Sequence, residues 1–158
     1  MAIEVITVDQ DRREAGYELL EKTDAFGFNA IGAGWYKSAP EGRWRFFLVT
    51  PMIDSRGPKW VYDRLMSALR VVKIPRGIKP LEIHLASPRE ERFYDLRKKL
   101  RIPDMPKTAE VNLFHAHGDD LERLGIYAIV LYRMGDMDPR AGDTARIFDS
   151  RVKKLLAA

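Results

Sequence analysis

Residues 28–50, FNAIGAGWYKSAPEGRWRFFLVT, predict an antiparallel β-hairpin. Aromatic and aliphatic residues are frequent in its two halves, Phe28–Lys37 and Arg43–Thr50, and such residues favour strands. The connection between the halves holds Pro40 and Gly42, and it is a little longer than the commonest hairpin turns. This hairpin therefore predicts at least one antiparallel strand pair in the fold.

Side chains along the first strand of the hairpin alternate between two faces. Ile31, Ala33 and Trp35 are expected to point the same way. Gly32 and Gly34 leave the opposite face nearly bare, which allows another backbone or a ligand to come close. Most aromatic side chains of the hairpin are expected in the core, and the remainder would line a pocket or a dimer surface. These aromatic residues are Trp35, Tyr36, Trp44, Phe46 and Phe47.

The chain after the hairpin predicts a helix, a strand and a second helix. Gly57 and Pro58 precede a segment whose apolar residues recur at helical spacing, and proline suits the first position of a helix. Leu81–Ala86 alternates apolar residues with others, which is typical of a strand with one buried face. The sequence SPRE at 87–90 matches a capping box and predicts a helix that continues to about Arg101.

Further segments complete the predicted order of elements. They are a helix over Asp9–Asp24, a short strand over Glu110–His115, a helical turn over Asp119–Leu124, an interior strand over Ile126–Arg133 and a helix over Thr144–Leu156. A hairpin implies antiparallel pairing, whereas strand–helix–strand steps favour parallel crossovers. We therefore predict a single globular domain, residues 1–158, with an α+β or α/β fold. It should hold a mixed four- to five-stranded sheet with an antiparallel hairpin and about four helices packed on it.

The composition argues against several classes of protein. The 158 residues include no cysteine, which excludes disulfide scaffolds, thiolate metal sites and cysteine nucleophiles. They include three histidines. No nucleophile elbow or phosphate-binding loop motif is present. The N-terminal segment does not resemble a signal peptide, and no apolar stretch is long enough to span a membrane. We therefore expect a cytoplasmic protein with no cofactor and no membrane partner.

Basic residues are concentrated in the middle of the chain. Residues 56–101 hold 13 basic and 5 acidic side chains, whereas the whole chain has a net charge of only +4. Gathered on one surface, these cations would form a phosphate-binding footprint for a nucleic acid. The candidate contacts are Arg92, Lys98, Lys99 and Arg101. The alternative is that the same residues form the solvated faces of two helices.

The string FHAHGDD at 114–120 suggests a metal site. Its residues His115, His117 and Asp119 are of the types that bind zinc or iron, and the two imidazoles would face the same way in an extended chain. Over about seven residues the string resembles the H-x-H-x-D segment of metallo-β-lactamase-fold hydrolases, which implies a metal-dependent hydrolase. That family also uses histidines further downstream, and this chain has none after His117. The alternative is a polar turn in which Asp119 caps a short helix.

A second group of candidate metal ligands joins Asp54, after one predicted strand, to Glu82 and His84 on the next. Many magnesium-dependent nucleases hold their metal with carboxylates placed in this way, but they usually carry lysine at the position of His84. The alternative is that Glu82 and His84 lie on a solvated face of the sheet.

These observations favour a non-catalytic protein that works by binding or self-association, with a homo-oligomer as the expected assembly. The hairpin aromatics and the exposed faces of the helices would supply the surface. Two alternatives remain open: a nucleic-acid-binding protein that uses residues 56–101, and a metal-dependent hydrolase that uses His115, His117 and Asp119.

Overall fold

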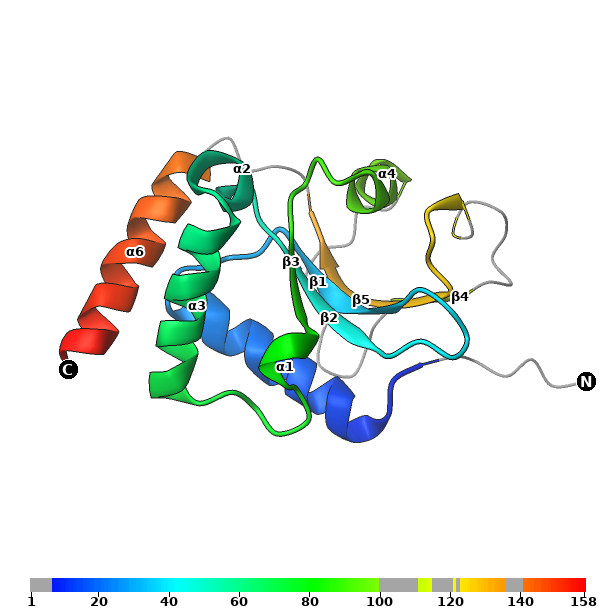
Figure 1. Ribbon diagram of the computed structural model, residues 1–158, viewed down its shortest axis with the longest axis horizontal. Coiled ribbons are helices and arrows are strands. Elements are labelled where there is room, and N and C mark those ends of the chain that lie inside the picture. Colours follow the sequence, from blue (N-terminus) through cyan, green and yellow to red (C-terminus); the bar gives the residue numbers. More distant parts are fainter. Residues whose placement is uncertain (1–6, 100–110, 115–120, 122, 136–140) are drawn as a thin grey trace, which may run out of the picture.

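A computed structural model describes residues 7–99, 111–114, 121, 123–135 and 141–158. The described chain forms a mixed five-stranded sheet with the strand order β3-β2-β1-β5-β4 (Figure 1). The strands are β1 (Gly32–Lys37), β2 (Arg45–Val49), β3 (Ile83–Ala86), β4 (Val111–Phe114) and β5 (Ala128–Met134). The helices are α1 (Gln10–Ala25), α2 (Met52–Arg56), α3 (Pro58–Val72), the 3-10 helix η1 (Pro80–Glu82), α4 (Glu91–Lys99) and α6 (Ala141–Ala157).

Strand pairing confirms the predicted fold class. β1 and β2 form the antiparallel hairpin, and β2 pairs in parallel with β3 after the crossover through α3. β5 lies antiparallel to β1, and β4 closes the other edge antiparallel to β5. The long helices α1, α3, α4 and α6 surround this sheet, so the α+β arrangement with a hairpin and about four helices is present.

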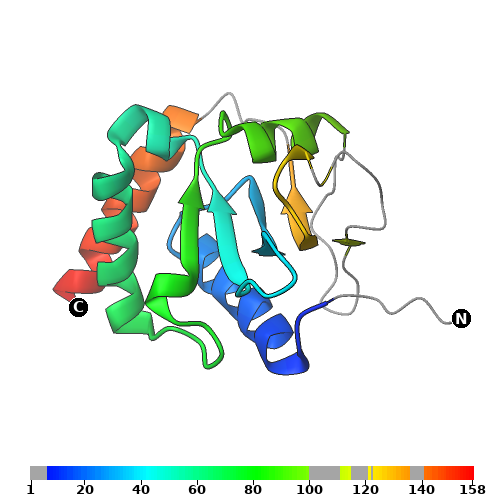
Figure 2. The same cartoon turned by 45° about the vertical axis from the view of Figure 1, so that its right-hand side comes forward.

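Helices cover both faces of the sheet. α1 crosses one face, while α4 lies over the other, as Figure 2 shows. α3 and α6 pack against each other, and their apolar residues join the core on the α1 side. This arrangement follows from alternation along β2: Phe46 and Leu48 enter the core under α1, whereas Phe47 and Val49 enter the core under α4.

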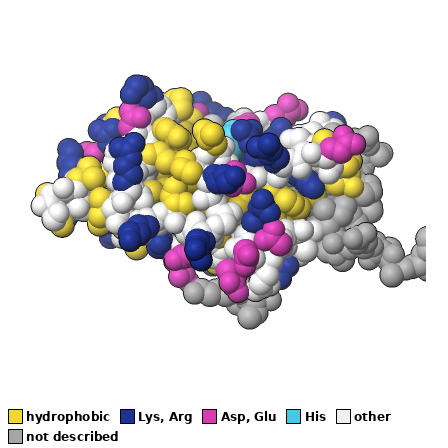
Figure 3. Space-filling model, turned by 60° about the horizontal axis from the view of Figure 1, so that its bottom comes forward, with side chains coloured by type: hydrophobic (Ala, Val, Ile, Leu, Met, Phe, Trp, Pro, Cys, Tyr) yellow, Lys and Arg dark blue, Asp and Glu magenta, His cyan; other side chains and the backbone are white. Residues whose placement is uncertain are grey.

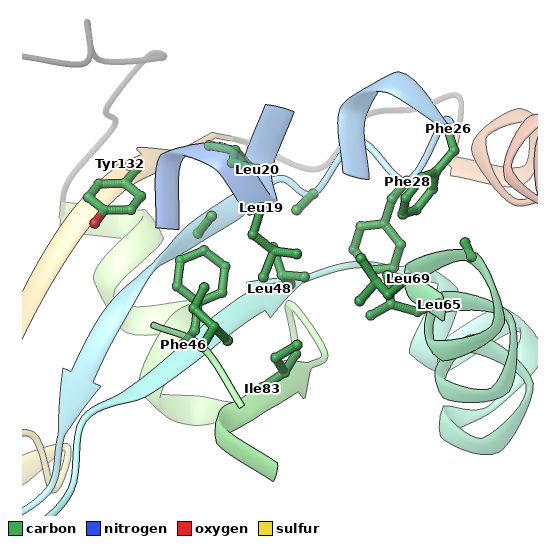
Figure 4. Close-up of a cluster of buried hydrophobic side chains, with 14 of the residues drawn as sticks. Leu19, Leu20, Phe26, Phe28, Phe46, Leu48, Leu65, Leu69, Ile83 and Tyr132 are labelled. Atoms are coloured by element: carbon green, nitrogen blue, oxygen red, sulfur yellow. The ribbon is translucent and has the colours of Figure 1, made fainter. Parts of the chain in front are cut away.

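The core on the α1 side is built mainly from large apolar side chains. Leu19 of α1 lies against the sheet residues Phe46 and Leu48, and Leu65 of α3 lies near Phe28, as the close-up in Figure 4 shows. All five of these side chains are fully buried. Burial of each such side chain contributes about 1.5–3 kcal/mol relative to an exposed one. This cluster therefore fixes α1 and α3 on the sheet.

Two glycines allow the backbone to pack closely. A β-carbon added to Gly34 would lie 2.0 Å from the carbonyl oxygen of Val130 on the neighbouring strand β5. One added to Gly16 on α1 would lie 2.6 Å from Tyr132 Cε2 and 2.8 Å from Trp35 Nε1. The bare face predicted around Gly34 is thus filled by the adjoining strand and by Phe47.

Several local predictions were wrong. Ile31 precedes β1 and packs with the core under α4, opposite to the side of Ala33 and Trp35. The short helix α2 was not predicted, because a single turn after Pro51 carries no periodic signal. α4 begins at Glu91.

The predicted cap of α4 does not form at Ser87. The Ser87 hydroxyl accepts the N–H of Arg89 at 3.0 Å and donates to both carboxylate oxygens of Asp54 at 2.9 and 2.8 Å. The Ser87 hydroxyl is therefore already bonded to Arg89 and to Asp54 of a neighbouring segment, and it does not cap α4. Residues 88–90 form a turn before the helix.

Candidate functional site

The hairpin aromatics do not supply an interaction surface. Trp35, Phe46 and Phe47 have no exposed area, and Tyr36 is 2% exposed. Trp44 is half-buried against the core, with the ammonium of Lys37 5.2 Å from the centre of its ring. The prediction that most of these residues are core is confirmed, and the expectation that they form a binding surface is wrong.

Exposed apolar residues gather instead around the outer face of α3. The inner face of this helix carries the predicted apolar stripe, which is buried: Val61, Leu65, Ala68 and Leu69. On the outer face Tyr62 is 39% exposed and Met66 is half-buried. Leu81, on the chain that leads to β3, is 86% exposed. It was predicted to share the buried face of β3, but Pro80 begins η1, so the strand alternation starts only at Ile83.

A groove runs beside these residues. Its volume is about 490 Å³, and it lies between α3 and the chain that leads to η1. We define the α3 surface as the exposed or half-buried residues that line the groove, together with Leu81, which follows the lining residue Pro80. The lining residues are Tyr62, Asp63, Met66, Ser67, Arg70, Ile74 and Pro80. Figure 3 looks onto this side of the molecule, where hydrophobic side chains gather with Lys and Arg around them.

Local interactions hold both walls of the groove. Pro58 opens α3 after Gly57, whose φ of 87° suits glycine. On the opposite wall the Glu82 carboxylate accepts the N–H of Lys79 at 2.8 Å, and the buried Ile78 anchors the loop. Leu81 therefore projects from a turn that local contacts hold in place.

The α3 surface carries one charge of each sign on the same side of the helix. Asp63 and Arg70 lie seven residues, or about two turns, apart, with Met66 between them. The Asp63 carboxylate is 2.6 Å from the Lys59 ammonium, an exposed pair of the i to i+4 type. Arg70 is exposed and has no polar partner among the residues that the structure describes.

The predicted nucleic-acid contacts fall on α4 and beyond it. Arg92 is half-buried: its Nε donates to the carbonyl of Leu124 at 3.3 Å, and its guanidinium lies 4.9 Å from the centre of the Tyr36 ring. Lys98 is exposed, with its ammonium 4.4 Å from the ring centre of Tyr94. Lys99 is the last residue of α4, its side chain is not described, and Arg101 lies outside the described residues.

The proposed metal ligands are not brought together by the described part of the structure. His115, His117 and Asp119 lie outside the described residues. Within those that are described, no group of three histidine or acidic side chains is placed to hold a metal ion.

The second group of candidate ligands is divided between the two ends of β3. Asp54 meets Ser87 where β2 and β3 end, whereas Glu82 precedes the first residue of β3 and caps η1. These carboxylates therefore do not share a site. His84 faces Glu90, with 3.4 Å between Nε2 and Oε2, and lies beside the rings of Tyr36 and Phe93. The imidazole lowers the pKa of the Glu90 carboxyl below its usual value.

Comparison with known proteins gives no further assignment. None of the helices in the described ranges combines the length and hydrophobicity needed to cross a membrane. No protein-family model, curated protein or solved structure matches the chain.

Proposed function

We propose that this protein is a self-associating module whose α3 surface pairs with the α3 surface of a second copy. The observation that carries the proposal is a groove beside α3 whose wall combines the apolar side chains Tyr62 and Met66 with two opposite charges on one helix. A two-fold interface requires a patch that is complementary to itself. A patch with charges of one sign repels its own copy in a two-fold pair. The α3 surface instead carries one charge of each sign, Asp63 and Arg70.

The charges fit an antiparallel arrangement of two α3 helices. A two-fold axis beside Met66 and Ser67 lies midway along the helix between Asp63 and Arg70. Antiparallel packing about that axis places Asp63 of each copy opposite Arg70 of the other. The two charge pairs would then flank Met66 at the centre, and Ser67 is small enough to allow close approach of the helices. Opposite charges at such positions mainly set register and orientation.

Apolar contact would supply most of the binding free energy. Tyr62 lines the groove and is 39% exposed, and Leu81, which follows the lining residue Pro80, is 86% exposed. Burial of a leucine side chain contributes about 1.5–3 kcal/mol. Because the interface is two-fold, each residue contributes twice. Aromatic anchors such as Tyr62 are also frequent among the residues that dominate interface energies.

Sedimentation equilibrium over a range of protein concentrations tests this proposal. The unaltered chain is expected to form a dimer, and Tyr62→Ser should shift it to monomer, with a dissociation constant higher by roughly a hundredfold or more. The matched control is Tyr94→Ser, because Tyr94 on α4 is 40% exposed and Tyr62 is 39% exposed. A monomer at all concentrations, or equal effects of the two substitutions, would contradict the proposal.

A second candidate function is nucleic-acid binding through α4. It is favoured by the exposed ring of Tyr94, which has Lys98 at 4.4 Å and Arg97 at 5.8 Å from its centre. An aromatic ring beside cations is the usual contact of single-stranded nucleic acids. Fluorescence anisotropy with mixed DNA and RNA at low salt tests it. Binding should weaken as salt is raised and should be reduced by Lys98→Ala; no binding at low salt excludes it.

A further inference from the structure

A separate apolar cavity lies where three helices end. Its volume is about 370 Å³, and its walls come from the last turns of α1, α3 and α6. Ala25, Phe26, Val72 and Leu155 form the apolar part of the wall. Small-molecule sites in proteins commonly have volumes of about 300–1,000 Å³ and are mainly apolar with a few polar groups. This cavity has the size and composition of such a site.

The charged side chains that line this cavity are all basic. They are Lys22, Arg151 and Lys154, and the last residue of the chain, Ala158, lies beside them. Lys22 Nζ donates to the carbonyls of Val72 and Lys73 at 3.1 and 2.8 Å and lies 3.4 Å from Glu18. One N–H of Arg151, from Nη1, is donated to the carbonyl of Ala25 at 3.1 Å.

Capping of helix ends accounts for two of these cations. Basic side chains stabilise the unpaired carbonyls at helix C-termini, and Lys22 and Arg151 do so for α3 and α1. It does not account for Lys154, which is exposed and has no polar partner among the described residues. It also does not account for the apolar walls. Arg151 retains further N–H donors, since its guanidinium carries five.

We infer that the cavity binds a small amphiphilic anion, a carboxylate carried on a short alkyl chain. The alkyl chain contacts Phe26, Val72 and Leu155, and the carboxylate is bound by Lys154 and the remaining donors of Arg151. Arg151, Lys154 and Leu155 are three or four residues apart on α6, so they face the cavity together. The ligand class is inferred from the combination of the apolar wall with Lys154 and the donors of Arg151 that no helix carbonyl occupies.

Isothermal titration calorimetry of the full chain with octanoate tests the inference. Octanoate should bind, and hexanoate should bind roughly fifteenfold more weakly, because each buried methylene contributes about 0.8 kcal/mol. The uncharged 1-octanol should bind more weakly than octanoate. Absence of octanoate binding at millimolar concentration, or binding of octanol as tight as that of octanoate, would overturn the inference.

Variants locate the site. Lys154→Ala should weaken octanoate binding by about threefold to tenfold and leave octanol unchanged. Lys153→Ala is the matched control, because Lys153 lies on the same helix, outside the cavity, 3.1 Å from Asp149. Ala25→Trp should block the cavity and abolish binding of both probes. An effect of Lys153→Ala equal to that of Lys154→Ala would overturn the inference. Tyr62→Ser leaves this cavity intact, so self-association and octanoate binding are measured independently.

Discussion

Single residues determine how closely the elements approach. Gly34 has no substitute in β1, because any β-carbon there would overlap the Val130 carbonyl oxygen across the β1–β5 register shift. Asp9 fixes the start of α1, where its carboxylate accepts the N–H of Arg12 at 2.9 Å. Both residues contact the backbone of another residue. A larger residue at position 34 would overlap the Val130 carbonyl, and an apolar one at position 9 would not accept the Arg12 N–H.

Gly34→Ala should lower the free energy of unfolding by about 3 kcal/mol or more, because the β1–β5 pairing must shift to accept the methyl group. Gly135→Ala is the control, since its β-carbon would lie 3.5 Å from the Ile31 carbonyl oxygen, an ordinary contact. Urea denaturation followed by circular dichroism measures both. Equal stability of the Gly34→Ala chain and the unaltered one would show that the close approach is not present.

Asp9→Ala should lower the free energy of unfolding by about 1 kcal/mol at neutral pH, the usual effect of losing a helix N-cap. The Arg12 N–H and guanidinium hold the pKa of the Asp9 carboxyl below its usual 3.8. The charged cap therefore contributes fully above about pH 4 and is lost as the pH falls through the lowered pKa. The stability difference between the two chains should narrow in that range, as urea denaturation at pH 2–7 measures. A difference that stays constant over this range would contradict the assigned cap.

At the scale of elements, the sequence pattern predicted the long helices, the antiparallel hairpin and a mixed sheet, but not the order of the strands. α3 and β5 were predictable because their buried residues follow a helical stripe and a continuous apolar run. The start of α4 was not, because the SPRE pattern does not show that Asp54 competes for the Ser87 hydroxyl. A contact between residues 33 positions apart carries no local signal.

The Asp54–Ser87 contact is expected to join α2 to the turn before α4. Asp54→Ala and Ser87→Ala should each destabilise the fold by about 1 kcal/mol, and the double variant should be less destabilised than the sum of the two. A double-mutant cycle in urea measures this coupling. Ser55→Ala, on the exposed side of α2, is the control and should change stability little. Strict additivity would show that the two side chains do not interact.

At the scale of the molecule, the fold was predictable and the candidate surface was not. The hairpin aromatics were recognisable as core, but the same pattern does not reveal where exposed apolar residues gather. Tyr62, Asp63 and Arg70 belong to an ordinary amphipathic helix in sequence. They become one surface only when the crossover to β3 places Pro80 beside them. The one local signal was Pro80, which ends the strand alternation before Leu81.

The two proposed binding functions use different parts of the molecule. Self-association uses the outer face of α3, whereas the basic-rimmed cavity uses the ends of α1, α3 and α6. Neither depends on the half-buried contact between His84 and Glu90 or on the hairpin. Both proposals therefore place binding on the helices, while the sheet holds the helices in position.

A charge exchange across α3 tests self-association most directly. Asp63→Arg and Arg70→Asp should each raise the dimer dissociation constant by roughly tenfold, because each places like charges opposite one another twice in a two-fold interface. The double variant Asp63→Arg with Arg70→Asp restores opposite charges and should return the dissociation constant to that of the unaltered chain. Sedimentation equilibrium of the unaltered chain, the two single variants and the double variant measures the four dissociation constants. Weakening of the double variant by the sum of the two single effects would contradict antiparallel pairing of α3.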